Sequence, residues 1–314
     1  MHIDEHPGTG GGRYVIQPNH PGVSLILLLF LMAVGYFVFG GLSIFVALAA
    51  TGVSGASDLM ANLEGSGTNA AALKVIQAGS SVGMFVFPPL ALSLLERRRT
   101  TYLDHTAAVP PSLWLIVIAV MFFAAPIIEL SIQLNEAMRL PAMLAGLEAW
   151  MQEQELQMER LTHLFLADTS YAGLLINLLV IAVIPAIGEE FLFRGSLQGI
   201  LMRWLGNPHA AIWLCAVVFS AIHLQFYGFL PRMLLGALFG YLLFWGRNIW
   251  LPIFAHFLNN AAATVSAFYL QRQGRSLDEI NFGDQIPFYV YLLSIAVATV
   301  LLYQYRKTAR TGKD

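Results

Sequence analysis

Two adjacent carboxylates and an arginine, Glu189, Glu190 and Arg194, follow an almost unbroken apolar stretch at residues 171–187. Charged side chains at membrane depth are costly and are usually kept for function or for a dedicated ion pair. Glu190 and Arg194 are four residues apart on one face of a helix, in the favourable acid-then-base order. Consecutive helical residues point about 100° apart, so we expect Glu189 and Glu190 not to share one partner. Glu189, which has no obvious local partner, is therefore the carboxylate that we expect to do chemistry.

Two further pairs of polar and aromatic side chains have the spacing of one helical turn. Phe219 and His223 end one apolar stretch, and His256 and Asn260 interrupt another. A single intramembrane histidine is often only a hydrogen-bonded packing residue. Polar groups in hydrocarbon need partners, however, and one shared buried site satisfies several of them together. We therefore expect these pairs to meet the carboxylate, whereas Asn259 points in another direction and bonds to a neighbouring helix.

The elements that must position these residues are membrane helices. The chain has 314 residues, of which 57% are hydrophobic and only 11% are charged. Soluble domains carry about 25% charged residues, so the composition indicates a polytopic membrane protein. The net charge of −2 argues against a nucleic-acid partner. The single cysteine, Cys215, lies inside an apolar stretch and is expected to be a small core residue.

The apolar stretches predict an all-α bundle of about eight transmembrane helices. Each is close to the ~20 residues that a helix needs to cross the hydrocarbon. They lie at residues 23–50, 71–95, 112–134, 171–190, 208–226, 230–246, 249–270 and 286–304. Counting residues from the inner surface places His223 near the outer side, unless its span starts deep, tilts, or turns back inside the membrane.

Loop charges predict the domain limits and the orientation. We expect a disordered cytoplasmic tail at 1–22, one membrane domain at 23–305 with its catalytic core at about 171–265, and a basic cytoplasmic tail at 306–314. We expect the protein to lie in the cell membrane with both termini in the cytoplasm. In this orientation the cytoplasmic side holds 11 basic residues and the outer side 6, as the positive-inside rule favours. The inner ones are Arg13, Arg97, Arg98, Arg99, Arg194, Arg203, Arg247, Arg306, Lys307, Arg310 and Lys313. The outer ones are Lys74, Arg139, Arg160, Arg232, Arg272 and Arg275.

Two segments between the spans are predicted to lie at the interface. Residues 136–170 have an apolar stripe at helical spacing opposite a glutamate-rich face, which is typical of an interfacial helix. The alternative is a lid that faces substrate. Residues 194–206 are expected to form a short interfacial elbow at the inner side.

The ordered set of these residues resembles the CPBP family, which contains type II CAAX prenyl proteases and bacteriocin-processing or immunity-associated proteins. The resemblance rests on Glu189-Glu190 with Arg194, on Phe219 with His223, and on His256 with Asn260, and it covers about residues 171–265. Gly236 and Gly240 lie between the last two motifs, where relatives also tend to place glycines. Each four-residue motif alone is weak, whereas the set in this order inside membrane spans is specific.

The resemblance implies an intramembrane endopeptidase whose substrate is a membrane-associated peptide or protein, including lipidated CAAX-like ones. Glu189 and His223 would activate a water molecule, while His256 and Asn260 would stabilise the oxyanion. Peptide hydrolysis needs such a base and such donors. Arg194 would neutralise Glu190, and Phe219 and Asn259 would support the site.

Zinc is the open question within this mechanism, because Glu189, His223 and His256 are also a ligand set of catalytic zinc. We favour no metal cofactor, since the HExxH arrangement is absent. Two functions from other classes stay open. A proton-coupled transporter also uses intramembrane glutamate and histidine, although no inverted repeat is visible. A non-catalytic scaffold or immunity partner would need the site only for packing.

Overall fold

A computed structural model describes residues 19–51, 70–96, 109–275 and 286–311 of the chain. Every regular element in those ranges is helical, as predicted. The main helices are α1 (Pro21–Thr51), α3 (Ala70–Ser81), α4 (Phe87–Leu95), α6 (Pro111–Glu136), α7 (Ala145–Leu166), α8 (Tyr171–Asn177), α9 (Ile184–Glu190), α10 (Gln198–Leu205), α11 (Pro208–Ala221), α12 (Phe229–Gly246), α13 (Trp250–Arg272) and α14 (Phe288–Thr311).

Six helical spans in the described ranges are long and apolar enough to cross a membrane. They are Pro21–Ala50, Ala70–Leu95, Pro111–Glu136, Tyr171–Leu205, Phe226–Gly246 and Phe288–Arg310. The regions predicted as the other two spans, 208–226 and 249–270, contain the shorter apolar helix α11 and the polar-interrupted helix α13, which are not among these six. The fold is thus the expected polytopic helical membrane bundle. The predicted domain limits stay a prediction, and residues 1–18 of the amino-terminal tail lie outside the described ranges.

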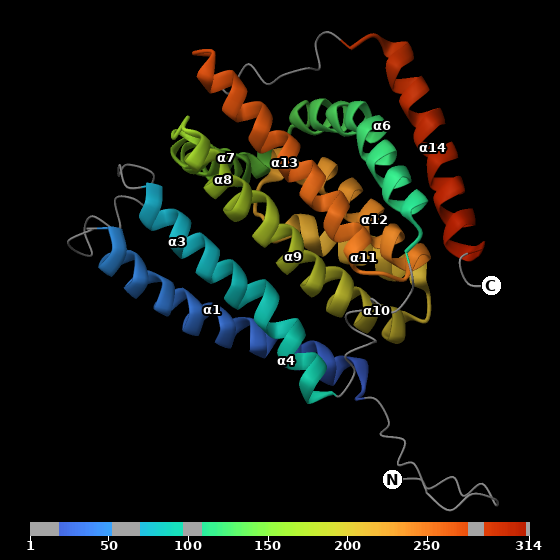
Figure 1. Cartoon of the computed structure of the whole chain (residues 1–314), viewed down its shortest axis with the longest axis horizontal. Coiled ribbons are helices and arrows are strands. Elements are labelled where there is room, and N and C mark those ends of the chain that lie inside the picture. The colour runs from blue at the N-terminus through green and yellow to red at the C-terminus, as the bar shows by residue number, and fades with distance from the viewer. Residues whose placement is uncertain (1–18, 52–69, 97–108, 276–285, 312–314) are drawn as a thin grey trace, which may run out of the picture.

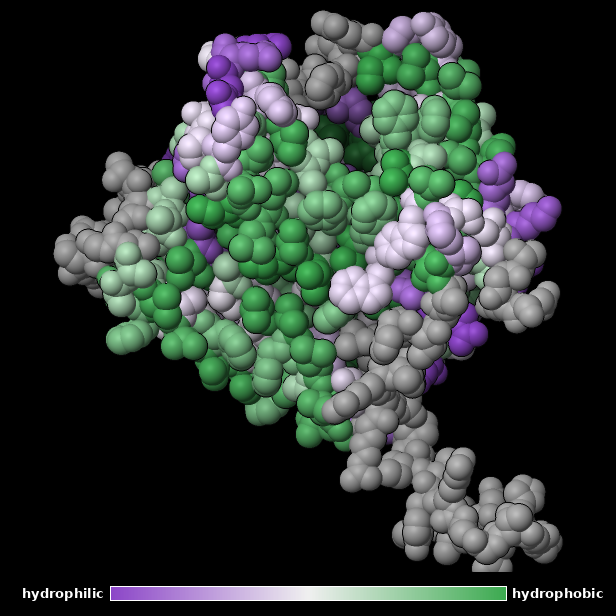
Figure 2. Space-filling model, in the orientation of Figure 1, coloured by the Kyte–Doolittle hydropathy of each residue, from purple (hydrophilic) through white to green (hydrophobic). Residues whose placement is uncertain are grey.

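The helices are arranged around the long element that carries the two glutamates (Figure 1). Helix α1 packs along α3 and α4 on one side of it. Helices α11, α12 and α13 lie on the other side, and α6 with α14 flanks them. The surface is largely apolar (Figure 2), with side chains such as Phe37, Phe122 and Leu175 exposed. An exposed apolar surface of this extent fits a lipid solvent.

Helices α8, α9 and α10 form one continuous helical element, Tyr171–Leu205, with π-helical turns at Leu178–Val183 and Phe191–Leu197. The predicted elbow at 194–206 is therefore wrong. Arg194, the first residue of that segment, is buried and paired within the bundle. Because its charge is satisfied internally, the helix continues through it. Ser170 caps the start of the element by accepting a hydrogen bond from the Gly173 N–H.

The span predicted at 208–226 is a helix of only 14 residues, Pro208–Ala221. At 1.5 Å per residue it covers about 21 Å, less than the ~30 Å of the hydrocarbon. The chain then turns through residues 222–228 and returns as α12. This early turn removes the mismatch in depth that the sequence alone left at His223.

Helix α7 lies beside this turn and contacts it through two side-chain hydrogen bonds. Gln225 Nε2 donates to Glu155 Oε1 at 3.1 Å, and Gln152 Nε2 donates to the Tyr227 hydroxyl at 3.3 Å. Non-helical backbone at membrane depth is tolerated where protein covers it or where it lines a cavity. Helix α7 provides such cover.

Candidate active site

Glu190 and Arg194 form the predicted ion pair, in the interior of the bundle. Arg194 Nη1 is 3.0 Å from Glu190 Oε1, and both side chains are almost fully buried. Arg194 Nη2 also donates to the Gly236 carbonyl of α12 at 2.9 Å, and its guanidinium lies 4.5 Å from the centre of the Phe219 ring. The pair therefore ties the glutamate helix to α11 and α12.

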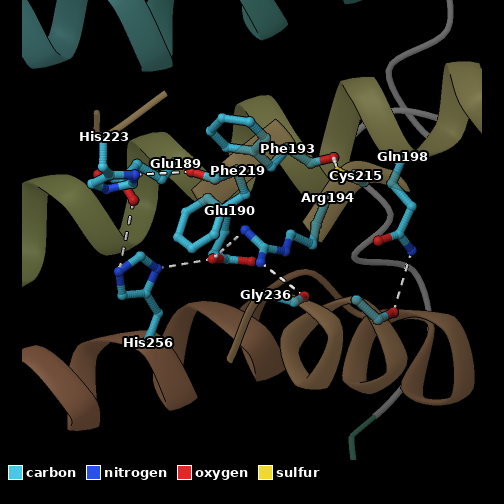
Figure 3. A network of polar contacts seen from close by, with 11 residues as sticks. Glu189, Glu190, Phe193, Arg194, Gln198, Cys215, Phe219, His223, Gly236 and His256 are labelled. Carbon is cyan, nitrogen blue, oxygen red and sulfur yellow. Dashed lines mark hydrogen bonds and ion pairs between the residues drawn. The ribbon is translucent and has the colours of Figure 1, made fainter. Parts of the chain in front are cut away.

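Both carboxylates face the same imidazole, that of His256 (Figure 3). Glu190 Oε1 is 2.8 Å from His256 Nδ1, and Glu189 Oε2 is 3.8 Å from His256 Nε2. The expectation that the two glutamates could not share a partner is wrong. Two adjacent helical residues point in different directions and do not reach the same atom. An imidazole, however, has two nitrogens on different edges of its ring, and each carboxylate faces one of them.

The contact with Glu190 determines which nitrogen of His256 carries the proton. The Glu190 carboxylate, which is paired with Arg194, is an acceptor, so the Nδ1–H group of His256 donates to it. The Nε2 atom of His256 then faces Glu189. Phe239 stacks on the ring at 5.2 Å between centroids and limits its rotation. Glu190 thus has a second role, holding His256, that the helical spacing did not reveal.

His223 lies in the turn after α11, where its Nδ1 is 2.8 Å from the Phe219 carbonyl. The Phe219 ring meets both histidine rings edge-on, at 5.3 Å from His223 and 6.2 Å from His256. Phe219 therefore packs against both imidazoles (Figure 3). The Nδ1–H bond to the backbone carbonyl leaves Nε2 of His223 free to act as a base.

Asn260 faces the π-helical turn at Leu178–Val183, and its Nδ2 donates to the Ile181 carbonyl at 3.0 Å. Asn259 does not bond to a neighbouring helix. Its Nδ2 donates to Asn260 Oδ1 at 3.2 Å, so it orients the adjacent amide. An amide nitrogen has two N–H groups, and one of those of Asn260 is left for another acceptor.

A cavity of about 640 Å³ lies between α7, the glutamate helix and α13. Of the predicted site residues it is lined by Glu189 and Asn260. Its walls are mostly apolar, with Leu161, Phe165 and Pro185 among them. One lining residue that the sequence reasoning missed is Arg232, which was assigned to an outer loop. The signal that could have found it is an arginine next to the apolar stretch of α12.

The described residues contain no group of three or more His, Cys, Asp or Glu side chains placed to hold a metal ion. His256 turns one nitrogen to each glutamate, and the Phe219 ring contacts the rings of both histidines edge-on. The alternative ligand set Glu189, His223 and His256 is thus not such a group in this arrangement of the described residues. Whether the protein uses a metal stays a prediction.

Comparison with known proteins agrees with the predicted resemblance over the part of the chain that carries this site. Residues 171–262 match the family of type II CAAX prenyl endopeptidases described as Rce1-like. The chain is also similar to the uncharacterized protein YpbD of Bacillus subtilis, with 27% identity over 89 residues. That alignment covers 27% of this chain and 42% of YpbD, less than half of either. No solved structure matches.

Proposed function

We propose that this chain is an intramembrane endopeptidase that hydrolyses a peptide bond of a membrane-associated peptide or protein, including lipidated CAAX-like substrates. The observation that carries the proposal is the position of Glu189. Its carboxylate lines a cavity inside the bundle and lies across from a histidine that a second glutamate holds in place. The Rce1-like match over residues 171–262 supports the same reaction.

In the proposed mechanism, Glu189 and His223 take the proton from the attacking water. A general base must lie within hydrogen-bond reach of that water, directly or through one more water. Glu189 opens onto the cavity where a peptide would lie, and His223 has its Nε2 available. Glu190 and Arg194 do not touch the substrate and act by positioning His256.

His256 and Asn260 stabilise the negative oxygen of the tetrahedral intermediate. Donors that are fixed before the reaction are effective because they need no reorganisation as the charge develops. The side-chain amide of Asn260 is held at both ends, because its Nδ2 donates to the Ile181 carbonyl and its Oδ1 accepts from Asn259. His256 donates from Nε2 when that nitrogen is protonated, while Glu190 holds Nδ1.

The cavity favours an apolar peptide. Its volume of about 640 Å³ lies in the range of ~300–1,000 Å³ that is usual for small-molecule sites. The apolar walls contributed by α7 and α13 would bury apolar side chains beside the scissile bond.

The proposal is tested with purified protein and a peptide library whose products are identified by mass spectrometry. We expect wild-type protein to cleave apolar peptides, and Glu189→Gln and His223→Ala each to reduce the rate by ~10²–10⁴-fold or more. Glu159→Gln is the matched control, because Glu159 lines the same cavity from α7 but is half exposed. Wild-type turnover by Glu189→Gln would remove the mechanism.

A further inference from the structure

Arg232 is a cation in the cavity that contains Glu189. It lies near the start of α12, and together with Glu189 and Asn260 it lines the 640 Å³ cavity. Its partners are neutral. Nη1 donates to the Gln225 carbonyl at 3.1 Å, and Nη2 donates to the Gln225 side-chain oxygen at 2.7 Å. Among the described residues, no carboxylate oxygen lies within 4.0 Å of a guanidinium nitrogen of Arg232, which is the distance that an ion pair requires.

The acidic residues around Arg232 compensate its charge only at longer range. Glu155 is connected to it through Gln225, whose amide donates to Glu155 Oε1 at 3.1 Å. Glu136 and Glu155 line a second cavity, of about 560 Å³, on which Arg232 also borders. A guanidinium has five N–H donors in a rigid fork, and the two bonds to Gln225 leave donors unused. A charge that is removed from water without a directly paired anion is costly.

A peptide in the cavity would bring an anion to this position. An apolar peptide has one obligatory negative group, the carboxylate at its carboxyl end. Arginine binds carboxylates through short, charge-assisted and often bidentate hydrogen bonds. Arg232 and Glu189 line the same cavity, so a carboxylate at Arg232 would leave only a short peptide segment between the chain end and the reacting glutamate.

We propose that Arg232 binds the free carboxylate of the substrate and thereby selects a peptide bond near the carboxyl end of the chain. The inference rests on the proposed peptidase function, for which the resemblance to CAAX proteases already implies cleavage near the carboxyl end, and it adds the residue that recognises that end. Arg232 is a specificity-determining residue in this view, and Gln225 holds its guanidinium toward the cavity.

The test compares three forms of a peptide that the wild-type protein cleaves: the free acid, the carboxamide, and the peptide extended by several residues. We expect kcat/KM to fall by about 10–100-fold from acid to amide, mainly through KM, because one charge-assisted contact is lost. In the extended peptide the cleaved bond should shift toward the new carboxyl end.

Variants separate recognition from support of the fold. Arg232→Gln should reduce kcat/KM for the acid by a similar factor and leave that for the amide nearly unchanged, so that the preference disappears. Arg232→Lys should keep part of the preference. Arg160→Gln, an exposed arginine on α7 that is not among the cavity-lining residues, is the matched control and should behave as wild type.

Each outcome is decisive. Equal cleavage of acid and amide by the wild type overturns the role of Arg232 while the peptidase function stands, and this comparison needs no variant to fold. A loss in Arg232→Gln that is the same for acid and amide shows a merely structural arginine and also overturns the proposal. No cleavage of any peptide by wild-type protein contradicts the proposed function itself.

Discussion

At the scale of residues, the site is a chain of charges that ends at the cavity. Arg194 pairs with Glu190, Glu190 accepts from His256, and His256 faces Glu189. The first two carry charge in a nearly water-free interior, where an unpaired ion is far more costly than a paired one. Such a chain holds an imidazole in one tautomer and orientation, which is what a proton-transfer or oxyanion site requires.

The Glu190–Arg194 pair predicts an asymmetric mutational pattern. Glu190→Ala leaves a buried guanidinium without its carboxylate and should lower stability by about 3–5 kcal/mol. The double variant Glu190→Ala/Arg194→Ala removes both charges and should recover part of that loss. Thermal unfolding in detergent measures both. A double variant no more stable than the single one would show that the pair is not the dominant interaction.

The metal question predicts different results for Asn260→Ala. If Asn260 is an oxyanion donor, kcat should fall by ~10²–10³-fold with little change in KM. A chelator should then have no effect on wild-type activity. If zinc is bound instead, Asn260→Ala would weaken metal binding by only ~10–100-fold. Stoichiometric zinc that is lost together with activity on chelation, and restored with it, would overturn the metal-free mechanism and leave the peptidase standing.

At the scale of elements, irregular helices bring the site together. The π-helical turn at Leu178–Val183 offers its Ile181 carbonyl to Asn260, and the turn at Phe191–Leu197 carries Arg194. Helix α11 ends early, at Ala221, so that His223 stops at the depth of the other residues. Helix α7 covers the resulting turn and lines the cavity, so it would face a substrate that binds there.

The contact between α1 and the π-helical turn at Val82–Val86 predicts a steric effect of substitution. A Cβ on Gly35 would collide with the Gly83 carbonyl, whereas a Cβ on Gly41, in the same helix, meets nothing within 4 Å. Small residues in membrane helices allow such close approach. Gly35→Leu should therefore cost about 1–3 kcal/mol or more in unfolding free energy. Gly41→Leu should be near neutral, and equal effects in thermal unfolding would contradict this packing.

At the scale of the whole molecule, the start of α1, the end of α4 and the end of α10 share one face. Asn19 and Ser24 at the start of α1 bond to Glu96 after α4. Arg203 at the end of α10 donates to the Ser24 hydroxyl at 3.0 Å and to the Asn19 carbonyl at 3.3 Å. These contacts place three helix ends on one side of the membrane. The positive-inside rule predicts that this side is the cytoplasmic one.

The orientation predicts which introduced cysteines a membrane-impermeant reagent labels in intact cells. Met143→Cys, at an exposed position before α7, should be labelled from outside. Leu205→Cys, exposed at the end of α10, should be labelled only after the cells are opened. Cys215 is buried and should remain silent in both experiments. The reverse labelling pattern would invert the topology.

The sequence alone was sufficient for the class of fold, the resemblance over about residues 171–265 and the Glu190–Arg194 pair. Each depends on properties that are local in the chain. Long apolar stretches predict membrane helices in whatever arrangement they pack, and a pair at i and i+4 meets within one helix. The four-residue spacings of the histidine motifs are local in the same way.

Only the tertiary structure decided the partners that come from different helices. His256 receives both glutamates because α13 packs against α9, and no spacing in the chain encodes which edge of the ring it presents. The end of α11, the continuity of the helix through Arg194 and the place of Arg232 depend on the same packing. A charge ends a membrane helix when it must reach water, and it is carried inside when a neighbouring helix supplies its partner. The spacing of residues along the chain does not show which of these two outcomes applies.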